Sequence, residues 1–592
     1  MGQSGSSGNG VSLLTPVLNS DKLNGETGTK CIITVNAAYS STTIYEADNR
    51  RYGAPVNVQL QRISEEGAEV GESVGLSASV MCPDEWNEWV VAHHPDANNY
   101  VHYQHYFELS CEMTLKKGER LSLRKVQNND NKGLLVLGDV KIEVVAGDDD
   151  TDVFEDNGVA TEPDDTDYDV FGLGEIPISY WWTIPDYAHN FDDAKTRELY
   201  ADMAASGINI VLHNGEVNQS PAENKRIMNI AGELGMKFIG QVSLGGEDVY
   251  LSQQRIDAVR EYLADSPYYL GEYISDEPSA TRFDELGQFT KDYLAAFPEK
   301  EVYINLFPYY ASTQQFGTST YSEHIEQYIE KVPTKSMCFD YYALNIAEGS
   351  LGDSYYTNID LVRSKTLAQR MPFWMIIQAG KVGKNTRMPS EKEERWNVWS
   401  ALAGGSKGIS YFCYWDPWDS ASDPDADVAM VHKDGEKTPK YYEIQKINSD
   451  IKTIGKKLLP CHADAVMLTH STYYPLYEND GKGRSNYGPV KALSGNTSIA
   501  MGCFRDARVS ESGENYKGYK VMTVSQMPCR DAEAYLTLDS SVTEIAVTHC
   551  NTTQTLQVNN TLNATVGAIT VSFDGEKLIV AMPEGEAALI EF

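Results

Sequence analysis

The sequence predicts a multidomain protein in which a central (β/α)8 TIM barrel is flanked by N-terminal and C-terminal β-sandwich domains. The chain has 592 residues, which is too long for a single hydrophobic core. From residue 175, short apolar runs alternate with amphipathic helical stretches. Eight such repeats in roughly 280 residues match the length of an eight-stranded α/β barrel. At both ends of the chain, strand-like runs occur without helices.

The composition narrows the classes of partner. A net charge of −36 disfavours nucleic acid and anionic membrane surfaces as partners. The sequence contains no apolar run of about 18 residues, so no membrane-spanning helix is predicted. The nine cysteines show neither a CxxC pair nor a Cys/His ligand spacing, so no metal site is predicted. No cofactor is predicted either. The 36 tyrosines and 9 tryptophans favour sugar binding only weakly, because β-rich proteins also use many tyrosines.

Residues 1–10, rich in Gly and Ser, are predicted to be a flexible tether. This stretch resembles the spacer of an exported lipoprotein after its signal has been removed. The sequence therefore predicts an exported protein at the bacterial cell surface or in the periplasm, lipid-anchored through a removed N-terminal signal.

Residues 11–146 are predicted to form the N-terminal β-sandwich, because short runs with period-two alternation are separated by Gly, Asn and Asp turns. Its aromatic residues could stack on sugar, as in a carbohydrate-binding module, or could pack in the core or at the rim: Trp86, Trp89, Tyr100, Tyr103 and Tyr106. Residues 147–174 are crowded with aspartates whose spacing does not fit an EF-hand loop, so a solvated acidic linker is predicted.

Residues 175–458 are predicted to form the barrel. Its expected strands are Ile176–Ile184, Ile208–Asn214, Lys237–Leu244, Leu270–Glu277, Val302–Phe307, Met337–Leu344, Phe373–Gln378 and Ile409–Trp415. Amphipathic helices are expected at Asp192–Ser206, Gln253–Leu263, Arg282–Ala296, Glu391–Ala403 and Tyr441–Ile454. Residues 459–592 return to strand-like runs, with a hairpin signal at Asp574-Gly575, and predict the C-terminal β-sandwich.

The carboxyl ends of barrel strands meet at one mouth, so the polar and aromatic residues there are expected to form one site. The candidate catalytic residues are Asp276, Glu277 and Asp340. The candidate substrate-binding residues are Tyr180, Trp182, His213, Asn214, Asn305, Tyr341, Tyr342, Gln378, Trp415 and Trp418. No Gly-rich loop with basic residues indicates a phosphate site, and a single histidine does not indicate a two-metal hydrolase. Two carboxyl groups beside aromatic rings are what cleavage of a glycosidic bond requires.

Because of these residues, the segment 175–458 resembles the (β/α)8 glycoside hydrolases of clan A. That resemblance implies that a Glu ending strand four is the acid/base, which Glu277 matches, and that a Glu ending strand seven is the nucleophile. Gln378 occupies the second place, and an amide cannot attack an anomeric carbon. The adjacent pair Asp276-Glu277 is similar to the Asp-Glu pair of glycoside hydrolase families 20 and 123, which implies substrate-assisted cleavage of N-acetylhexosaminides. Alternatively, Asp340 supplies the base or nucleophile.

The sequence therefore predicts a glycoside hydrolase acting on an oligosaccharide or polysaccharide, with Glu277 as general acid/base and a pKa raised by Asp276. A substrate-assisted N-acetylhexosaminidase and a non-catalytic glycan-binding surface protein remain as alternatives. Separation of the carboxyl groups bears on the mechanism: about 5 Å favours retention, and about 6.5–9.5 Å favours inversion of the anomeric centre.

Overall fold

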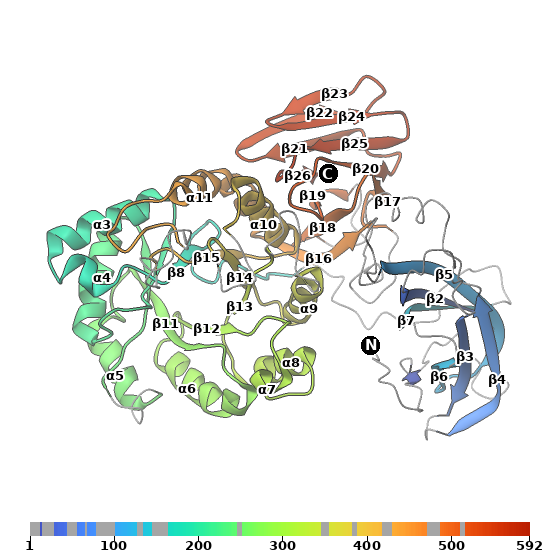
Figure 1. The fold of residues 1–592 in the computed structure, drawn as a ribbon, viewed down its shortest axis with the longest axis horizontal. Coiled ribbons are helices and arrows are strands. Elements are labelled where there is room, and N and C mark those ends of the chain that lie inside the picture. The colour runs from blue at the N-terminus through green and yellow to red at the C-terminus, as the bar shows by residue number, and fades with distance from the viewer. Residues whose placement is uncertain are drawn as a thin grey trace. The chain divides into compact units, whose positions relative to one another are not determined.

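The computed structural model describes residues 12–14, 29–43, 56–64, 68–78, 101–126, 134–144, 164–245, 251–344, 355–381, 388–416, 429–469, 486–509 and 516–592. The chain divides into two compact units. One comprises residues 1–158 with 471–475, and the other comprises residues 159–470 with 476–592. Figure 1 shows the central barrel and the C-terminal strands of the second unit.

The first unit contains two antiparallel sheets. One has the order β1 (Ser12–Leu14), β6 (Arg120–Val126), β3 (Val56–Ile63), β4 (Glu69–Ala78), and the other has β5 (Val101–Leu115), β2 (Thr29–Thr43), β7 (Leu134–Val144). Apolar residues two apart, such as Val58 and Leu60, are fully buried, as the alternation predicts. Trp86, Trp89 and Tyr100 lie outside the described residues, and the side chains of Tyr103 and Tyr106 are not described either. A carbohydrate-binding role for this domain stays a prediction.

Eight parallel strands form the barrel of the second unit, as predicted. In chain order they are β8 (Ile178–Trp181), β9 (Ile210–Leu212), β10 (Lys237–Gly240), β11 (Tyr269–Asp276), β12 (Glu301–Leu306), β13 (Met337–Tyr341), β14 (Phe373–Gln378) and β15 (Gly408–Phe412). β15 pairs with β8. β8 and β9 close the ring through hydrogen bonds from Asn209 N to Ile178 O, 3.1 Å, and from Thr183 N to Asn214 O, 3.2 Å.

Helices surround this ring, as Figure 1 shows. The main ones are α3 (Asp193–Ala205), α4 (Pro221–Glu233), α5 (Gln253–Tyr262), α6 (Phe283–Ala296), α8 (Tyr321–Lys331), α9 (Tyr355–Ala368), α10 (Glu391–Ala403) and α11 (Pro439–Asp450). Side-chain caps start several of them. Ser390 and Glu393, for example, form a capping box at α10.

Strand alternation separates two apolar layers. An inner cluster fills the barrel with side chains such as Tyr273, Tyr303, Cys338 and Trp374. The opposite faces of the same strands pack against the helices, as Ile304 does. Tyr303 and Cys338 point into the barrel. Because side chains alternate along a strand, Asn305 and Asp340, each two positions further along, also point inward, at the mouth.

The start of β11 is held by a buried ion pair. Arg255 on α5 donates to Glu272 Oε2 from Nε at 3.0 Å and from Nη2 at 2.7 Å, and both residues are at most 1% exposed. Tyr269 OH and the backbone N–H of Val242 also donate to the Glu272 carboxylate. The charge of Glu272 is thus fully compensated, which is the condition under which a buried ion pair is tolerated.

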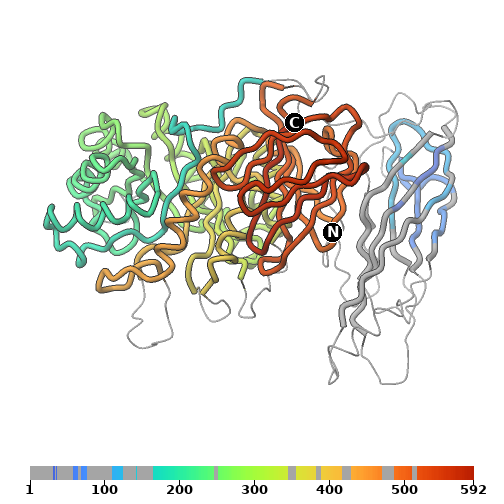
Figure 2. The backbone as a smooth tube through the Cα atoms, turned by 90° about the horizontal axis from the view of Figure 1, so that it is seen from above, coloured from blue at the N-terminus to red at the C-terminus, as the bar shows by residue number. Residues whose placement is uncertain are grey.

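The C-terminal strands form a β-sandwich. One sheet has the strand order β16 (Cys461–Leu468), β18 (Ile499–Asp506), β19 (Tyr519–Ser525), β26 (Ala587–Glu591), β21 (Glu544–His549), β22 (Thr552–Gln557). The other has the order β17 (Val490–Gly495), β20 (Ala532–Leu538), β25 (Lys577–Met582), β24 (Ile569–Phe573), β23 (Asn563–Val566). The sandwich packs against the barrel, where Trp396 Nε1 of α10 donates to Ser525 O at 2.7 Å. Figure 2 shows these strands beside the barrel helices. Within the described residues, no helix is both long enough and apolar enough to cross a membrane.

We expect Arg255→Leu to lower the free energy of unfolding by about 3–5 kcal/mol, because it leaves the Glu272 carboxylate buried without a cation. Arg260→Leu is the matched control on the same helix. Its carboxylate partner is Asp257, at 2.6 Å, and both side chains are more than half exposed, so its substitution should change the free energy of unfolding much less. Urea denaturation of the three proteins measures both changes. Equal losses in the two variants would contradict the assigned role of the buried pair.

Candidate active site

A β-bulge in β11 brings Asp276 to the mouth. Tyr273 pairs with Tyr303, but Ser275 pairs with Ile304 and Asp276 pairs with Asn305, so Ile274 is an extra residue. Strict alternation would put Asp276 on the same face as Ile274, which packs toward the helices. The extra residue reverses this assignment, and Asp276 therefore lies beside the inward-facing Asn305.

The Asn305 side chain joins two of the predicted catalytic acids. Its Nδ2 donates to Asp276 Oδ1 and to Asp340 Oδ1, both at 2.9 Å. Its Oδ1 accepts from Cys338 Sγ at 3.7 Å, and Tyr303 OH lies 2.9 Å from the same sulfur. These contacts fix the orientation of the amide, so that its nitrogen and not its oxygen faces the carboxyl groups.

Glu277 follows directly in an unusual backbone conformation. Its φ is 43°, in the left-handed region, which costs a non-glycine residue about 1–3 kcal/mol. Its N–H donates to Asn305 O at 2.8 Å, which extends the pairing of β11 with β12 by one residue. Its carboxyl group is hydrogen-bonded to that of Asp340. Glu277, Asp276 and Asp340, the three predicted catalytic residues, therefore lie in one cluster around Asn305.

The cluster raises the pKa values of all three acids. Burial, then the charge of Asp276, raises the pKa of Glu277 to about 7, and the hydrogen bond from Asp340 opposes the rise. Burial and the charge of Glu277 raise the pKa of Asp340 well above its usual range, so Asp340 is the proton donor of this pair. Asp276 opens to solvent at the end of the strand, yet surrounding protein still removes enough hydration to raise its pKa.

Two tyrosines complete the surroundings of the acids. Tyr342 was predicted from its position at a strand end. Burial raises its pKa, and the nearby charges of Asp340 and Tyr310 raise it further. Tyr310 was not predicted. It lies in the loop after β12, is 51% exposed, and contacts Tyr341 edge-to-face at 5.1 Å. The Pro308-Tyr309-Tyr310 run directly after strand five was the signal available in the sequence.

Gln378 ends β14, where the clan A resemblance implies a nucleophilic Glu. The residue is fully buried. Its Oε1 accepts from Leu344 N at 3.1 Å, and its Nε2 donates to Gly380 O at 3.0 Å. The amide thus joins the loop after β13 to the loop after β14. A Glu at this place could not donate to Gly380 O when ionised, which gives a structural reason for the amide.

The residues ending β8 and β9 are tied to each other. Asn214 Oδ1 accepts from Trp182 N at 2.9 Å. His213 is 1% exposed, its Nε2 lies 3.3 Å from Asn218 O, and burial lowers its pKa to about 4, so its ring is neutral at pH 7. The indole of Trp182 packs against Gly215, where a Cβ would come within 3.3 Å of the ring. Contact of these three residues with sugar stays a prediction.

Three other predicted residues are buried away from the acids. Tyr180 faces the helix layer and its OH donates to Ser206 Oγ at 2.6 Å. Tyr341 also packs in that layer. Trp415 is 2% exposed, and its Nε1 donates to the hydroxyl of Tyr187 at 2.9 Å, while Tyr187 itself is 51% exposed. Tyr187 is therefore the ring that this pair presents to solvent. Trp418 lies outside the described residues.

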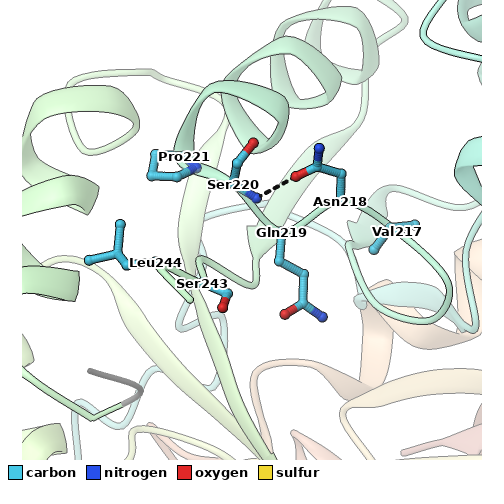
Figure 3. A pocket seen from close by; sticks show the side chains of 7 residues that line it. All are labelled: Val217, Asn218, Gln219, Ser220, Pro221, Ser243 and Leu244. Carbon is cyan, nitrogen blue, oxygen red and sulfur yellow. Dashed lines mark hydrogen bonds between the residues drawn. The ribbon is translucent and has the colours of Figure 1, made fainter. Parts of the chain in front are cut away.

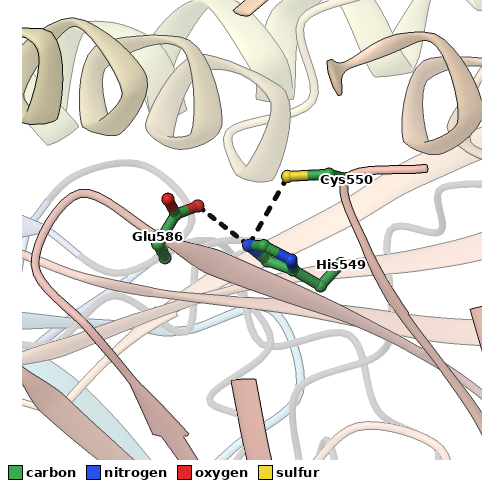
Figure 4. Close-up of side chains that lie close together, drawn as sticks. All are labelled: His549, Cys550 and Glu586. Carbon is green, nitrogen blue, oxygen red and sulfur yellow. Dashed lines mark hydrogen bonds and ion pairs between the residues drawn. The ribbon is translucent and has the colours of Figure 1, made fainter. Parts of the chain in front are cut away.

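Two clusters in the described chain bring together side chains of metal-ligand type, and neither favours a cation. In the cluster His549, Cys550 and Glu586 (Figure 4), Ala568 N donates to His549 Nδ1. The imidazole proton is therefore on Nε2, which donates to Glu586 at 2.9 Å. Arg395 already places a positive charge there, 2.8 Å from Glu586.

The second cluster consists of Asp186, His189 and Glu223. Here Phe191 N likewise donates to Nδ1 of His189, and Arg226 donates to Glu223 at 2.6 Å. Both clusters are thus internally neutralised by an arginine, and a metal ion would have to displace it.

Glu277→Gln is expected to stabilise the folded protein at neutral and alkaline pH. Because the folded-state pKa of about 7 exceeds the usual value of 4.5, ionisation opposes folding as pH rises from about 4.5 to 7. The gain in thermal midpoint over wild type should therefore be absent below pH 4.5, grow to pH 7 and then level off. Glu261→Gln on α5, an exposed position, is the control and should show no such trend. A pH-independent difference for Glu277→Gln would contradict the raised pKa.

Comparisons with known proteins bear on the barrel. Residues 298–454, a little over a quarter of the chain, match the glycosyl hydrolase 42 model, described as β-galactosidase. No curated protein matches the chain.

Among solved structures, a family 39 glycoside hydrolase from the gut symbiont Bacteroides cellulosilyticus WH2 is 8% identical over 98% of this chain and 100% of that one, with a TM-score of 0.39. A β-galactosidase from Rahnella sp. R3 is 12% identical over 50% and 58%, with a TM-score of 0.38. An exo-β-1,4-mannosidase from Opitutaceae bacterium strain TAV5 is 12% identical over 50% and 63%, with a TM-score of 0.35.

None of these three TM-scores reaches 0.5, so the fold is assigned from the strand order of this chain itself. The family match falls within the ring of eight parallel strands and covers β12 to β15. The chain is therefore a (β/α)8-barrel glycoside hydrolase, in agreement with its predicted resemblance to clan A.

Proposed function

We propose that this protein cleaves glycosidic bonds in an oligosaccharide or polysaccharide at the mouth of the barrel, with Glu277 as general acid/base. The observation that carries the proposal is the position of Glu277 at the end of the fourth strand with a pKa raised to about 7. A carboxyl group with this pKa is still substantially protonated at neutral pH and can protonate the leaving oxygen. Burial raises the pKa of its neighbour Asp276 as well, and the hydrogen bond from Asn305 opposes that rise.

Asp340 acts on Glu277 in this proposal. A hydrogen bond between the two carboxyl groups places them closer together than the roughly 5 Å or more that separates acid and nucleophile, or acid and base, in glycosidases. Asp340 therefore orients Glu277 and shares a proton with it, and it does not attack the anomeric carbon from the opposite face. The tyrosines Tyr310 and Tyr342 border the same acids and would contact the sugar ring.

We expect Glu277→Gln to lower kcat/KM by about 10²–10⁴-fold, since the acid is lost. The substrates are β-linked disaccharides that release galactose, glucose, mannose or N-acetylglucosamine, because a sugar alkoxide must be protonated as it leaves. For wild type, kcat/KM should fall as pH rises through about 7, where Glu277 deprotonates. Gln288→Ala on the outer helix α6 serves as the control. Undiminished hydrolysis by Glu277→Gln would remove Glu277 from its role, and binding without any sugar release would favour a non-catalytic glycan-binding protein.

A 2-acetamido sugar is a second candidate for the substrate, favoured by the carboxylate of Asp276 directly beside Glu277. In this reaction the acetamido oxygen attacks the anomeric carbon while Glu277 protonates the leaving oxygen. Asp276 accepts the acetamido N–H and so increases the nucleophilicity of that oxygen. Water then opens the oxazoline at the anomeric carbon, and Glu277 takes its proton. The route needs no carboxylate at Gln378, which supports it.

Asp276→Asn separates the two substrate classes. If the acetamido route operates, this variant should lose about 10²-fold or more in kcat on the N-acetylglucosaminide, because an amide cannot accept the N–H with the same strength. It should also move the alkaline limb of the pH profile to lower pH, since the charge that raises the pKa of Glu277 is gone. Equal losses on acetamido and neutral glycosides would reject the acetamido route while leaving Glu277 in place.

Export to the bacterial cell surface or periplasm is part of the same proposal and is supported by the Gly/Ser-rich residues 1–10. Intact-mass analysis of the protein from its native source tests it. Lipid on the amino terminus would support anchoring, and an unprocessed cytoplasmic form would contradict export.

A further inference from the structure

A pocket lies at the mouth end of the barrel, between the loops that follow β9 and β10. It is an open hollow of about 490 Å³, within the range of about 300–1,000 Å³ typical of small-ligand sites. Val217, Asn218 and Gln219 line it from one loop, and Ser243 and Leu244 line it from the other. β10 is the neighbour of β11 in the ring, so the pocket is at the same end of the barrel, next to the strand that carries Glu277.

Hydrogen bonds that involve backbone groups fix both walls of the pocket. Ser243 N donates to Gln219 O at 2.7 Å and joins the two loops. Asn218 Oδ1 accepts from Ser220 N at 2.8 Å, and Asn218 O lies 3.3 Å from the buried His213 ring. Figure 3 shows the side chains of Gln219 and Ser243 extending to the same side from these facing loops. A ligand that enters would thus meet a shape that already exists, which reduces the entropy lost on binding.

The lining is chemically suited to an uncharged polar ligand. It combines amide and hydroxyl groups with the apolar side chains of Val217, Pro221 and Leu244, and none of the described residues that line it is charged. Amides and hydroxyls bond sugar hydroxyls, while apolar groups cover the C–H faces of the ring. The net charge of −36 opposes binding of anionic sugars such as uronates or sulfated residues.

Exposed apolar residues support a longer binding path along this rim. The described part of the chain exposes six large hydrophobic residues, and four of them follow barrel strands at the mouth: Tyr187, Phe191, Leu244 and Tyr310. Tyr187 and Phe191 lie between β8 and α3, Leu244 borders the pocket, and Tyr310 borders the acids. All four belong to connections at the mouth end of the barrel, where they offer apolar contacts to a ligand that extends along it.

We propose that the β9–β10 pocket is a second subsite that binds an uncharged sugar unit of an extended glycan while another unit occupies the Glu277 site. The inference rests on the proposed glycoside hydrolase function and adds the substrate class: neutral oligosaccharides that extend beyond the unit at the Glu277 site, in preference to uronate-bearing glycans. Gln219 and Ser243 supply hydrogen bonds to hydroxyls, and Leu244 contacts the ring. These residues bind and do not take part in the chemistry.

Binding to the full-length Glu277→Gln protein tests this subsite without hydrolysis. The probes are fluorescently labelled galactan, mannan, xylan and glucan oligosaccharides of two to six residues, with oligogalacturonides of equal length as the acidic set. Affinity should rise with length for at least one neutral series. Adding Ser243→Trp, which fills the pocket, should weaken binding of the longest members at least tenfold and remove the length dependence. Adding Gln219→Ala should weaken it about three- to tenfold, the loss of one or two hydrogen bonds.

Both substitutions keep the backbone bond between Ser243 and Gln219, and thermal midpoints verify folding. Gln288→Ala on the outer surface of α6 is the control in the same background. The subsite is overturned by binding that is independent of length or unaffected by Ser243→Trp, by preference for oligogalacturonides, or by no binding of any neutral series. Failure of the proposed hydrolase function is distinguishable: wild type would then bind neutral glycans with the same length dependence and release no sugar.

Discussion

The side-chain amide of Asn305 is the contact on which the rest of the site depends. Three carboxyl groups lie at one barrel mouth, and their mutual repulsion and loss of hydration oppose that arrangement. A single Nδ2 that donates to both Asp276 and Asp340 offsets part of this cost and sets their relative positions. Asp340 in turn orients Glu277. The amide itself is oriented from below by the thiol of Cys338, so the barrel interior determines the geometry at the mouth.

The raised pKa of Glu277 follows from this arrangement and not from burial alone. Burial is the largest cause, the neighbouring charge of Asp276 raises the pKa further, and the hydrogen bond from Asp340 opposes the rise. The left-handed backbone at Glu277 is a further local cost. Strain and charge repulsion at the same residue are tolerated because the surrounding barrel is stable, which is the usual trade between stability and activity at enzyme sites.

The mouth combines this acidic centre with an uncharged, partly apolar rim. In the proposed reaction the acids act on a glycosidic oxygen, which every glycoside has, so they do not by themselves select a sugar. Selection would come from the loops after β8, β9, β10 and β12, which carry the pocket and the exposed rings. Barrel enzymes commonly separate chemistry on strand ends from specificity on loops.

Much of this architecture could be predicted from the sequence. Eight alternating repeats are enough to indicate the barrel, because parallel strands with short helical connections have few other ways to bury both faces of the sheet. The position of Asp276 and Glu277 at the end of the fourth strand followed from the same count. Glu277, Asn305 and Asp340, which the structure brings together, were therefore named as candidate site residues without a structure.

What the sequence could not supply was the direction and pairing of individual side chains. Alternation along β11 places Asp276 on the helix side, and only pairing with β12 reveals the extra residue Ile274 that turns it inward. Likewise, Tyr310 reaches the acids through the path of its loop, and Gln378 is engaged by backbone groups from two loops. Sequence periodicity reports local geometry, whereas bulge position, loop path and hydrogen-bond partners are settled by contacts between strands that are distant in the chain.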